Sequence, residues 1–312
     1  MSYDLVKEGL EKIKSAKHLA LALISYNHKS RPMEYTCYSL NFRTDQLLKQ
    51  TISEMCTCFI GVIDKQGRDI KNYTGANPKN VTDKIHLSNG LIKNQWGNLI
   101  QSLNVCDDNT SLNKIKSQAY IFSGAFENDE GDHNIYILSR KNPIYTYKKG
   151  RAKIFASKHN IIQEIGEPLV QFGKTFDALI YKGTMYTINN NFESVFNMEY
   201  THKIVCKSSL EIIGKASIIN NFEIYKSFAL SKQHPRKFIT FDKRIIDNIR
   251  QVNNLKILVD ELKIPYDEKR QKFNLDKQDH AELFTKAICG KTKHNMFIGG
   301  ICEVQSFIPL KI

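Results

Sequence analysis

The stretch AYIFSGAFENDEGDHNIYILS, residues 119–139, indicates the fold class most directly. Two runs rich in β-branched and aromatic residues, 119–126 and 134–139, flank a polar segment around Gly131. Because such runs favour extended backbone and glycine suits a turn, this pattern is typical of an antiparallel hairpin. We therefore expect the middle of the chain to form an antiparallel sheet.

Similar strand signals occur on both sides of this hairpin. Residues 18–26 and 34–42 are separated by a polar stretch containing Pro32, which predicts another antiparallel pair. A last strand is expected at residues 301–308 and would return to the sheet. The other predicted strands are residues 143–147, 152–156, 175–181 and 184–188.

Helical periodicity marks the N-terminal third of the chain. Apolar residues at helical spacing predict helices over residues 4–17 and 44–56. A third helix is expected from an N-cap at Ser88 to residue 103, with the single tryptophan, Trp96, on its buried side.

Helical patterns dominate after Asn189. One helix is predicted after Thr240, and another from a cap at Asp276 to Gly290. The fold class is therefore α+β. We expect a mixed N-terminal domain with an antiparallel sheet, residues 1–190, and a mainly helical domain, residues 191–312.

The chain carries a large excess of positive charge. Its 312 residues include 45 Lys and Arg against 32 Asp and Glu, which gives a net charge of +13 and a pI near 9.2. This balance favours a polyanionic partner (nucleic acid, an acidic membrane surface or an acidic protein) over an ordinary metabolic enzyme. A bias of the composition towards Lys, Asn and Ile is the alternative explanation.

The expected location is the cytoplasm. The N-terminus lacks the uninterrupted apolar stretch of a signal peptide, and the longest apolar run, residues 19–24, is far below the roughly 20 residues that span a bilayer. Seven cysteines without a Cys-x-x-Cys motif fit free thiols in a reducing compartment. We expect no direct membrane insertion, so that any membrane association is peripheral or depends on a partner.

The first of two basic clusters lies in a predicted strand–turn–strand. Residues 133–162 contain no acid, and Tyr145, Tyr147 and Phe155 are interleaved with the cations, as in surfaces that contact phosphates and bases. An exposed hairpin or a contact with an acidic protein is the alternative. The residues assigned to DNA binding are Arg140, Lys141, Lys148, Lys149, Arg151 and Lys153.

The second basic cluster spans residues 226–250, where Asp242 and Asp247 are the only acids. Residues 231–237 contain Pro235 and are predicted to form a loop leading into a helix, so that cations and helix amides would meet a phosphate. An ion-pair row on the helix is the alternative for the later cations. The residues assigned to DNA binding are Lys226, Lys232, Arg236, Lys237, Lys243, Arg244 and Arg250.

No catalytic residue is assigned from the sequence. Two places come near a metal-dependent nuclease site, which needs acids to hold the metal and a lysine near the scissile phosphate. The segment Asp267-Glu268-Lys269 has this composition, but it follows Pro265 and has no clear metal-ligating strand before it, whereas Asp177 with Lys182 lacks a second acid. Gly290-Lys291-Thr292 lacks the earlier glycine of a phosphate-binding loop.

No cofactor or metal ligand is assigned either. His202 and Cys206 have the spacing of two ligands on one helical turn, and Cys56 with Cys58 would add thiolates. Neither pair is accompanied by a second half-site with the usual spacing.

One hairpin and the helix start after it resemble a known family. Residues 176–190 read FDALIYKGTMYTINN, and Phe192, Glu193 and Phe196 follow. This glycine-centred hairpin with a Phe-Glu-x-x-Phe helix start resembles KwaB, the soluble component of the two-gene Kiwa anti-phage defence system. The chain length, the excess of basic residues and the predicted helical C-terminal half also agree with this family. The matching residues are fold-forming rather than catalytic.

The resemblance implies a DNA-binding effector that acts with KwaA, a small multi-pass membrane protein. We therefore expect an anti-phage effector that binds DNA largely independently of sequence and blocks processes on phage DNA. It would form a homo-oligomer and be recruited to the inner membrane by its KwaA-like partner. Two alternatives stay open: a metal-dependent nuclease with an unconventional site, and a regulatory protein that docks an acidic partner.

Overall fold

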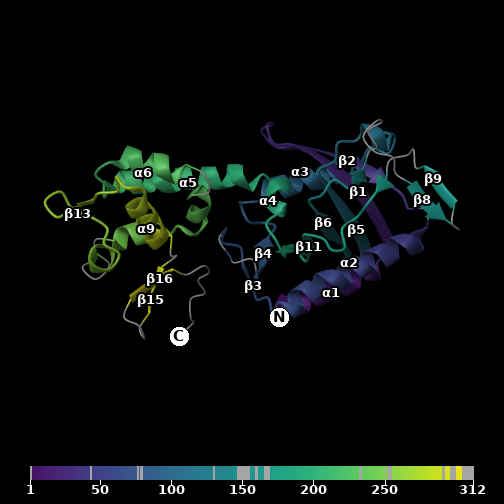
Figure 1. The fold of residues 1–312 in the computed structure, drawn as a ribbon, viewed down its shortest axis with the longest axis horizontal. Helices are drawn as coiled ribbons and strands as arrows, with labels where there is room; N and C mark the ends of the chain where they lie inside the picture. Colours follow the sequence, from purple (N-terminus) through teal and green to yellow (C-terminus); the bar gives the residue numbers. More distant parts are fainter. Residues whose placement is uncertain are drawn as a thin grey trace. The chain divides into compact units, whose positions relative to one another are not determined.

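The chain separates into two compact units (Figure 1). Unit 1 comprises Met1–Asn72 and Lys79–Asn197, and unit 2 comprises Tyr73–Pro78 and Met198–Ile312. The computed structural model describes residues 2–42, 44–75, 77, 80–128, 131–145, 155–158, 161–164, 169–231, 234–249, 251, 255–289, 292–295 and 300–303.

Unit 1 is built on an eight-stranded sheet. All neighbouring strands are antiparallel except β3 and β4, which are parallel. The predicted antiparallel sheet and the α+β class are therefore confirmed. The strands in spatial order are β2 (Glu34–Leu40), β1 (His18–Asn27), β5 (Ala119–Asn128), β6 (Gly131–Ser139), β11 (Ala178–Tyr181), β12 (Thr184–Thr187), β4 (Thr82–His86) and β3 (Ile70–Asn72).

Two hairpin pairings set the register at the centre of this sheet. Asn128 pairs with Gly131, so residues 119–139 form the expected hairpin. Between β11 and β12, Lys182 and Gly183 both have positive φ, 46° and 68°, as in a type I′ hairpin turn. Gly183 adopts this conformation without steric cost.

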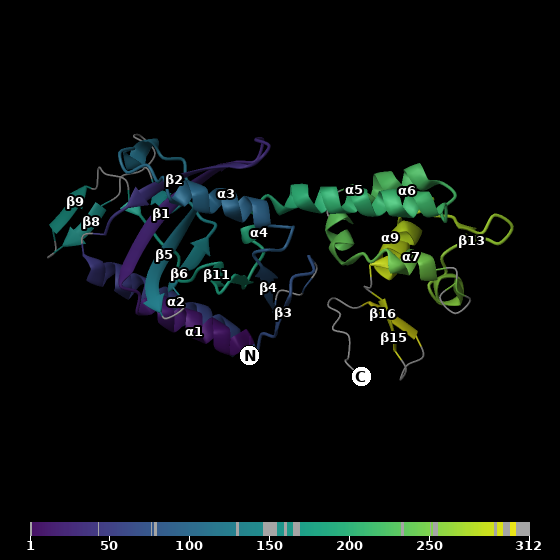
Figure 2. The ribbon, with the colours of Figure 1, turned by 180° about the vertical axis from the view of Figure 1, so that it is seen from behind.

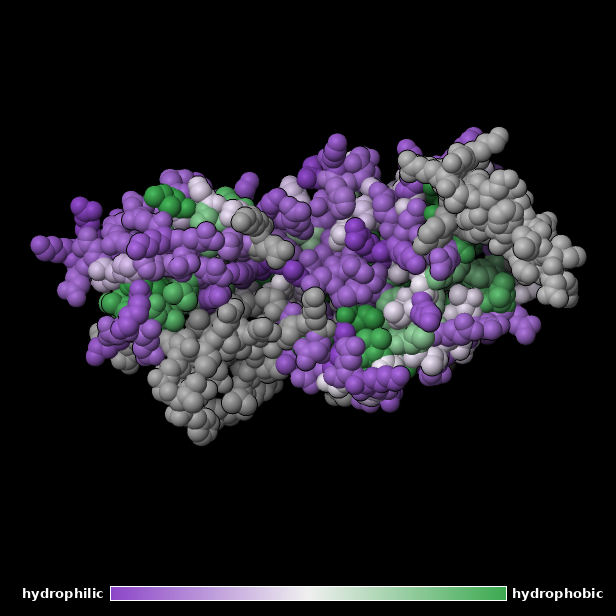
Figure 3. All heavy atoms as spheres, in the orientation of Figure 1, coloured by the Kyte–Doolittle hydropathy of each residue, from purple (hydrophilic) through white to green (hydrophobic). Residues whose placement is uncertain are grey.

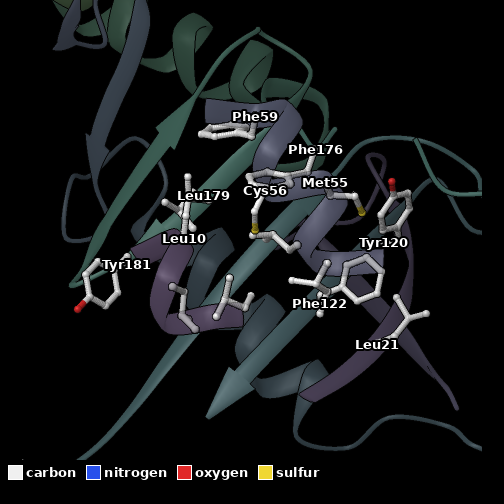
Figure 4. Packing of buried hydrophobic residues seen from close by; sticks show 14 of the residues in the cluster. Leu10, Leu21, Met55, Cys56, Phe59, Tyr120, Phe122, Phe176, Leu179 and Tyr181 are labelled. Carbon is white, nitrogen blue, oxygen red and sulfur yellow. The ribbon is translucent and has the colours of Figure 1, made fainter. Parts of the chain in front are cut away.

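Helices α1 (Ser2–Lys14) and α2 (Asp45–Lys65) cover one face of the sheet (Figures 1 and 2). Their apolar side chains and those of the central strands form one buried core, in which the rings of Phe59 and Phe176 stack with centroids 4.3 Å apart (Figure 4). Each large side chain buried here stabilises the fold by about 1.5–3 kcal/mol.

Helix α3 (Lys93–Leu103) covers the opposite face. Trp96 is half-buried there and packs edge-on against Tyr136 of β6, with centroids 5.2 Å apart. The predicted N-cap at Ser88 is wrong, because its hydroxyl bonds to Nδ1 of His86 at 3.0 Å and the helix begins only at Lys93.

Unit 2 is mainly helical. Its elements enclose a second core around Tyr225, Phe238 and Phe284. Gly75 also belongs to this unit, and a Cβ at its position would lie 2.7 Å from Cδ1 of Ile239. The helical elements are α5 (Met198–Ala216), α6 (Phe222–Ala229), the 3-10 helix η2 (His234–Thr240), α7 (Arg244–Asn248), the π-helical turn η3 (Ile257–Glu261) and α9 (Gln278–Ile288).

Shorter elements complete the two units. In unit 1 these are β7 (Ile144–Tyr145), β8 (Phe155–Lys158), β9 (Ile161–Glu164), β10 (Leu169–Val170), the 3-10 helix η1 (Leu112–Lys114) and α4 (Phe192–Val195). In unit 2 they are β13 (Tyr266–Asp267), β14 (Lys272–Phe273), β15 (Thr292–Asn295) and β16 (Gly300–Glu303). Among the helices that the structure describes, none has the length and apolar character needed to cross a membrane.

Two expectations for the C-terminal part are wrong. Strand β16 pairs with β15 and not with the eight-stranded sheet, while residues 304–308 of the expected strand lie outside the described residues. Helix α9 has its N-cap at Lys277, not at Asp276, and its C-cap at Cys289, while the predicted closing residue Gly290 lies outside the described residues. Asp276 instead accepts a hydrogen bond from Nδ2 of Asn221 at 2.5 Å.

Candidate nucleic-acid interface

The second basic cluster divides among several elements of unit 2. Lys226 lies on α6, Arg236 and Lys237 lie on η2, and Lys243 and Arg244 lie at the start of α7. The structure describes only these five cations of the cluster. Lys232 and Arg250 lie outside the described residues.

The segment predicted to be a cationic loop is largely helical. Residues 234–240 form η2, with Pro235 and Phe238 buried. Nζ of Lys237 lies 3.1 Å from Oε1 of Glu282 on α9, and 22% of the lysine side chain is exposed. This contact lowers the pKa of Glu282. Although residues 231–237 contain no acid, α9 therefore supplies Lys237 with an acidic partner, Glu282, that lies 45 residues later in the chain.

The start of α7 presents two exposed cations, Lys243 and Arg244. The guanidinium of Arg244 contacts the carboxylate of Asp242 and lowers its pKa. The same carboxylate accepts the backbone N–H of Arg244 at 2.9 Å. Asp242 therefore occupies this N–H at the start of α7, and the prediction that helix amides contact a phosphate stays a prediction.

A groove between α5 and α6 adds a cation that the sequence did not reveal. The groove has a volume of about 230 Å³ and is lined by Leu210, Phe222, Leu230, Lys207, Glu211 and Lys226. Lys207 is exposed, and Nζ of Lys226 lies 3.1 Å from Oε2 of the exposed Glu223. The helices approach closely because α5 has Gly214 opposite Phe222, where a Cβ would lie 2.9 Å from the ring.

The first basic cluster belongs to unit 1. Arg140 and Lys141 follow β6, and Arg140 is exposed while Lys141 is half-buried. Lys148, Lys149, Arg151 and Lys153 lie outside the described residues. The two predicted clusters are therefore parts of different units.

The acids considered for nuclease chemistry have structural partners. The buried carboxylate of Asp177 accepts hydrogen bonds from the backbone N–H of Arg140 at 2.6 Å, and from the side-chain amides of Asn189 at 2.6 Å and Asn191 at 2.9 Å. Lys182 pairs instead with Glu8, at 2.9 Å. Asp177 therefore fixes the segment after β12 to the end of β6 and does not form an acid–lysine pair with Lys182.

Asp267, the other candidate, lies in the short hairpin of β13 and β14. Its carboxylate accepts the backbone N–H of Arg270 at 3.0 Å and lies 3.7 Å from Nε of the same residue. These contacts shape the hairpin turn.

His202 and Cys206 face the interior of unit 2. The hydroxyl of Tyr73 bonds to Nε2 of His202 at 3.2 Å, and the thiol of Cys206 donates to the carbonyl of Ala229 at 3.5 Å. Burial, aided by the charge of Arg236, lowers the pKa of His202 to about 4. Over the part of the chain that the structure describes, no three His, Cys, Asp or Glu side chains gather as a metal site.

The family model described as Kiwa protein KwaB-like matches residues 116–289. This region extends from just before β5, through the hairpin of β11 and β12, to the end of α9, and covers more than half of the chain. The chain belongs to the KwaB-like family. Membership points to Kiwa anti-phage defence and confirms the resemblance predicted from residues 176–196. No curated protein and no solved structure matches the chain.

Proposed function

We propose that this KwaB-like protein is a Kiwa defence effector that binds DNA largely independently of sequence and so blocks processes on phage DNA. Family membership supports the defence role. The net charge of +13 is the observation that carries DNA binding. The structural partners of Asp177 and Asp267 favour binding over cleavage.

In unit 2 the proposed contact surface comprises Lys207, Lys226, Lys243 and Arg244. Ion pairs exposed to water, such as those of Lys226 and Arg244, are worth about 0–1 kcal/mol, so a phosphate can replace the carboxylate at low cost. Lys237 is a weaker candidate than its sequence position indicates, because Glu282 holds it. The second proposed surface is the first basic cluster. It comprises Arg140, Lys141, Lys148, Lys149, Arg151 and Lys153.

The experiment is a mobility-shift series on duplex DNA of several sequences at increasing salt. If roughly five phosphates are neutralised, the logarithm of affinity should fall with the logarithm of salt concentration at a slope of about −4 to −5. The affinity should depend little on sequence. A flat response, or no shift at low salt, would contradict DNA binding.

Three double variants test the surface. Lys207→Glu with Lys226→Glu, and Lys243→Glu with Arg244→Glu, should each reduce the salt slope by up to about two units. Lys29→Glu with Lys49→Glu makes the same charge change at exposed residues of unit 1 and is the matched control. Equal losses in all three would show that only net charge matters. Magnesium-dependent nicking would instead favour the nuclease, and lost defence with intact DNA affinity would favour an acidic protein partner.

The proposal also includes a KwaA-like multi-pass membrane partner, which would recruit the chain to the inner membrane, and a homo-oligomeric state. Family membership in a Kiwa component supports a partner. The chain's own described helices supply no membrane-crossing segment, so the proposal assigns anchoring to that partner.

A further inference from the structure

Two cysteines of unit 1 lie next to each other across a short parallel bridge. Tyr38 of β2 pairs with Asp107, which follows α3. The backbone N–H of Asp107 donates to the carbonyl of Cys37, and that of Ser39 donates to the carbonyl of Asp107, both at 2.9 Å. Cys37 and Cys106 each precede a bridge residue, so they are neighbours in the same register.

The bridge geometry suits a disulfide. Side chains alternate between the two faces of extended backbone, so Cys37 and Cys106 point to the same side, opposite to Tyr38 and Asp107. Neighbouring strands lie about 4.8 Å apart, and disulfides join Cα atoms that are about 4.4–6.8 Å apart. The spacing of paired strands therefore falls within the range that a disulfide joins.

The two thiols differ in exposure and acidity. Cys37 is 2% exposed, whereas Cys106 is half-buried and reachable from solvent. Hydrogen bonding from Cys37 lowers the pKa of Cys106, while the same contact and burial raise the pKa of Cys37. Cys106 is therefore the thiol that an oxidant meets first, and Cys37 is the resolving thiol behind it.

We propose that Cys37 and Cys106 form a reversible disulfide under oxidising conditions, a modification site that is independent of DNA binding. The oxidant is a peroxide. The Cys106 thiolate attacks hydrogen peroxide, giving a sulfenic acid and hydroxide. The Cys37 sulfur then attacks the sulfenic sulfur, and the S–S bond forms as the S–O bond breaks. The released hydroxide takes the Cys37 proton to give water, and a dithiol reductant reverses the oxidation.

The disulfide would tie strand β2, at the edge of the sheet, to the end of α3. It would close a loop of about 70 residues that contains all of α2, so it constrains the unfolded chain strongly. We therefore expect the thermal midpoint of oxidised unit 1 to rise by roughly 5 °C or more.

The test treats the full chain with hydrogen peroxide and maps its peptides by non-reducing mass spectrometry. The expected result is a peptide pair bridged by Cys37 and Cys106, with a higher thermal midpoint that dithiothreitol reverses. Cys106→Ser should abolish both effects, while Cys58→Ser, at an exposed cysteine of α2, should abolish neither. Thiols that stay alkylatable after peroxide, a different pairing, or a midpoint shift that survives in Cys106→Ser would overturn the proposal. If Cys37→Ser fails to fold, Cys106→Ser still decides it.

Discussion

The carboxylate of Asp177 connects the end of β6 to the segment after β12 by accepting three hydrogen bonds. Removing it breaks three part-buried hydrogen bonds to a charged acceptor, so Asp177→Ala is expected to destabilise the protein by about 2–4 kcal/mol. Urea unfolding measures this loss. Asp267→Ala, in a surface hairpin, is the control and should cost under about 1 kcal/mol. Wild-type stability in Asp177→Ala would contradict the structural role, and loss of a DNA-nicking activity in the folded variant would restore the catalytic interpretation.

His202 makes stability depend on pH. Its pKa in the folded protein is about 4, below the unfolded value near 6.5, so the unfolded state binds the proton more readily. The stabilisation is complete above about pH 6.5 and is lost as the pH falls towards 4. Between pH 7 and pH 5 this residue should account for about 2 kcal/mol of lost stability.

Urea unfolding of the wild type and of His202→Gln at both pH values checks this prediction. The variant keeps a group that can accept the Tyr73 hydroxyl but cannot titrate, so its loss between pH 7 and pH 5 should be smaller by that amount. Parallel pH profiles for the two proteins would show that His202 is not the cause. Arg236 and Glu199, the charges that act on His202, are unchanged in both.

Elements with a local signal could be predicted, whereas elements that depend on distant partners could not. The Lys182-Gly183 pair predicts its hairpin turn from the sequence alone, and both residues have the positive φ that such a turn requires. Strand β4 reads as polar, and its Thr82 and Asp83 are buried only because β4 joins β12, about 100 residues later. For the same reason, the sequence did not predict the contact of Lys237 with Glu282, nor the groove that Lys207 shares with Lys226.

Two predictions differ from the observed helices, one in the type of element at Pro235 and one in the length of α2. Proline was taken to indicate a loop, yet the first turn of a helix tolerates proline. Pro235 is the second residue of η2. Helix α2 was predicted to end near residue 56, but Phe59 and Ile63 continue its buried stripe to Lys65. Burial against the sheet extends this helix beyond its strongest local signal.

The outer face of α5 supports the proposed homo-oligomer. Tyr200, Ile204 and Ile212 are 40%, 45% and 38% exposed on this helix, and Figure 3 shows hydrophobic spots within the mostly hydrophilic surface of unit 2. We propose that a second copy packs on α5 through these exposed apolar side chains.

Ile204→Glu with Ile212→Glu is expected to reduce the oligomer to monomers, because it places like charges at the centre of the paired face. Light scattering coupled to size exclusion measures the mass. Leu47→Glu, at an apolar residue of α2 that is 49% exposed, is the control and should leave the mass unchanged. A mass that none of these changes alters would exclude this face.

At the scale of the whole molecule, the family match includes parts of both units, from residue 116 in unit 1 to residue 289 in unit 2. The KwaB-like region therefore joins half of the eight-stranded sheet to most of the helical unit. The separate folding of residues 1–190 and 191–312 stays a prediction. No linker or shift in composition marks the boundary, so the sequence supplies only a change from strand to helix signals near that point.

Membrane recruitment is the last prediction and belongs to the assembly as a whole. Expressed without its KwaA-like partner, the chain should stay in the supernatant after ultracentrifugation, and it should move to the membrane pellet when the partner is present, because the proposal assigns anchoring to that partner. Immunoblots of both fractions measure this distribution. A basic surface can also bind anionic lipid directly, at about 1 kcal/mol per Lys or Arg near the membrane, and salt screens that attraction. A salt wash of the pellet, with Lys207→Glu/Lys226→Glu beside Lys29→Glu/Lys49→Glu, separates the two routes. Retention that needs the partner and survives salt supports the assembly, whereas pelleting of the isolated chain that salt reverses would assign the basic surface to lipid instead.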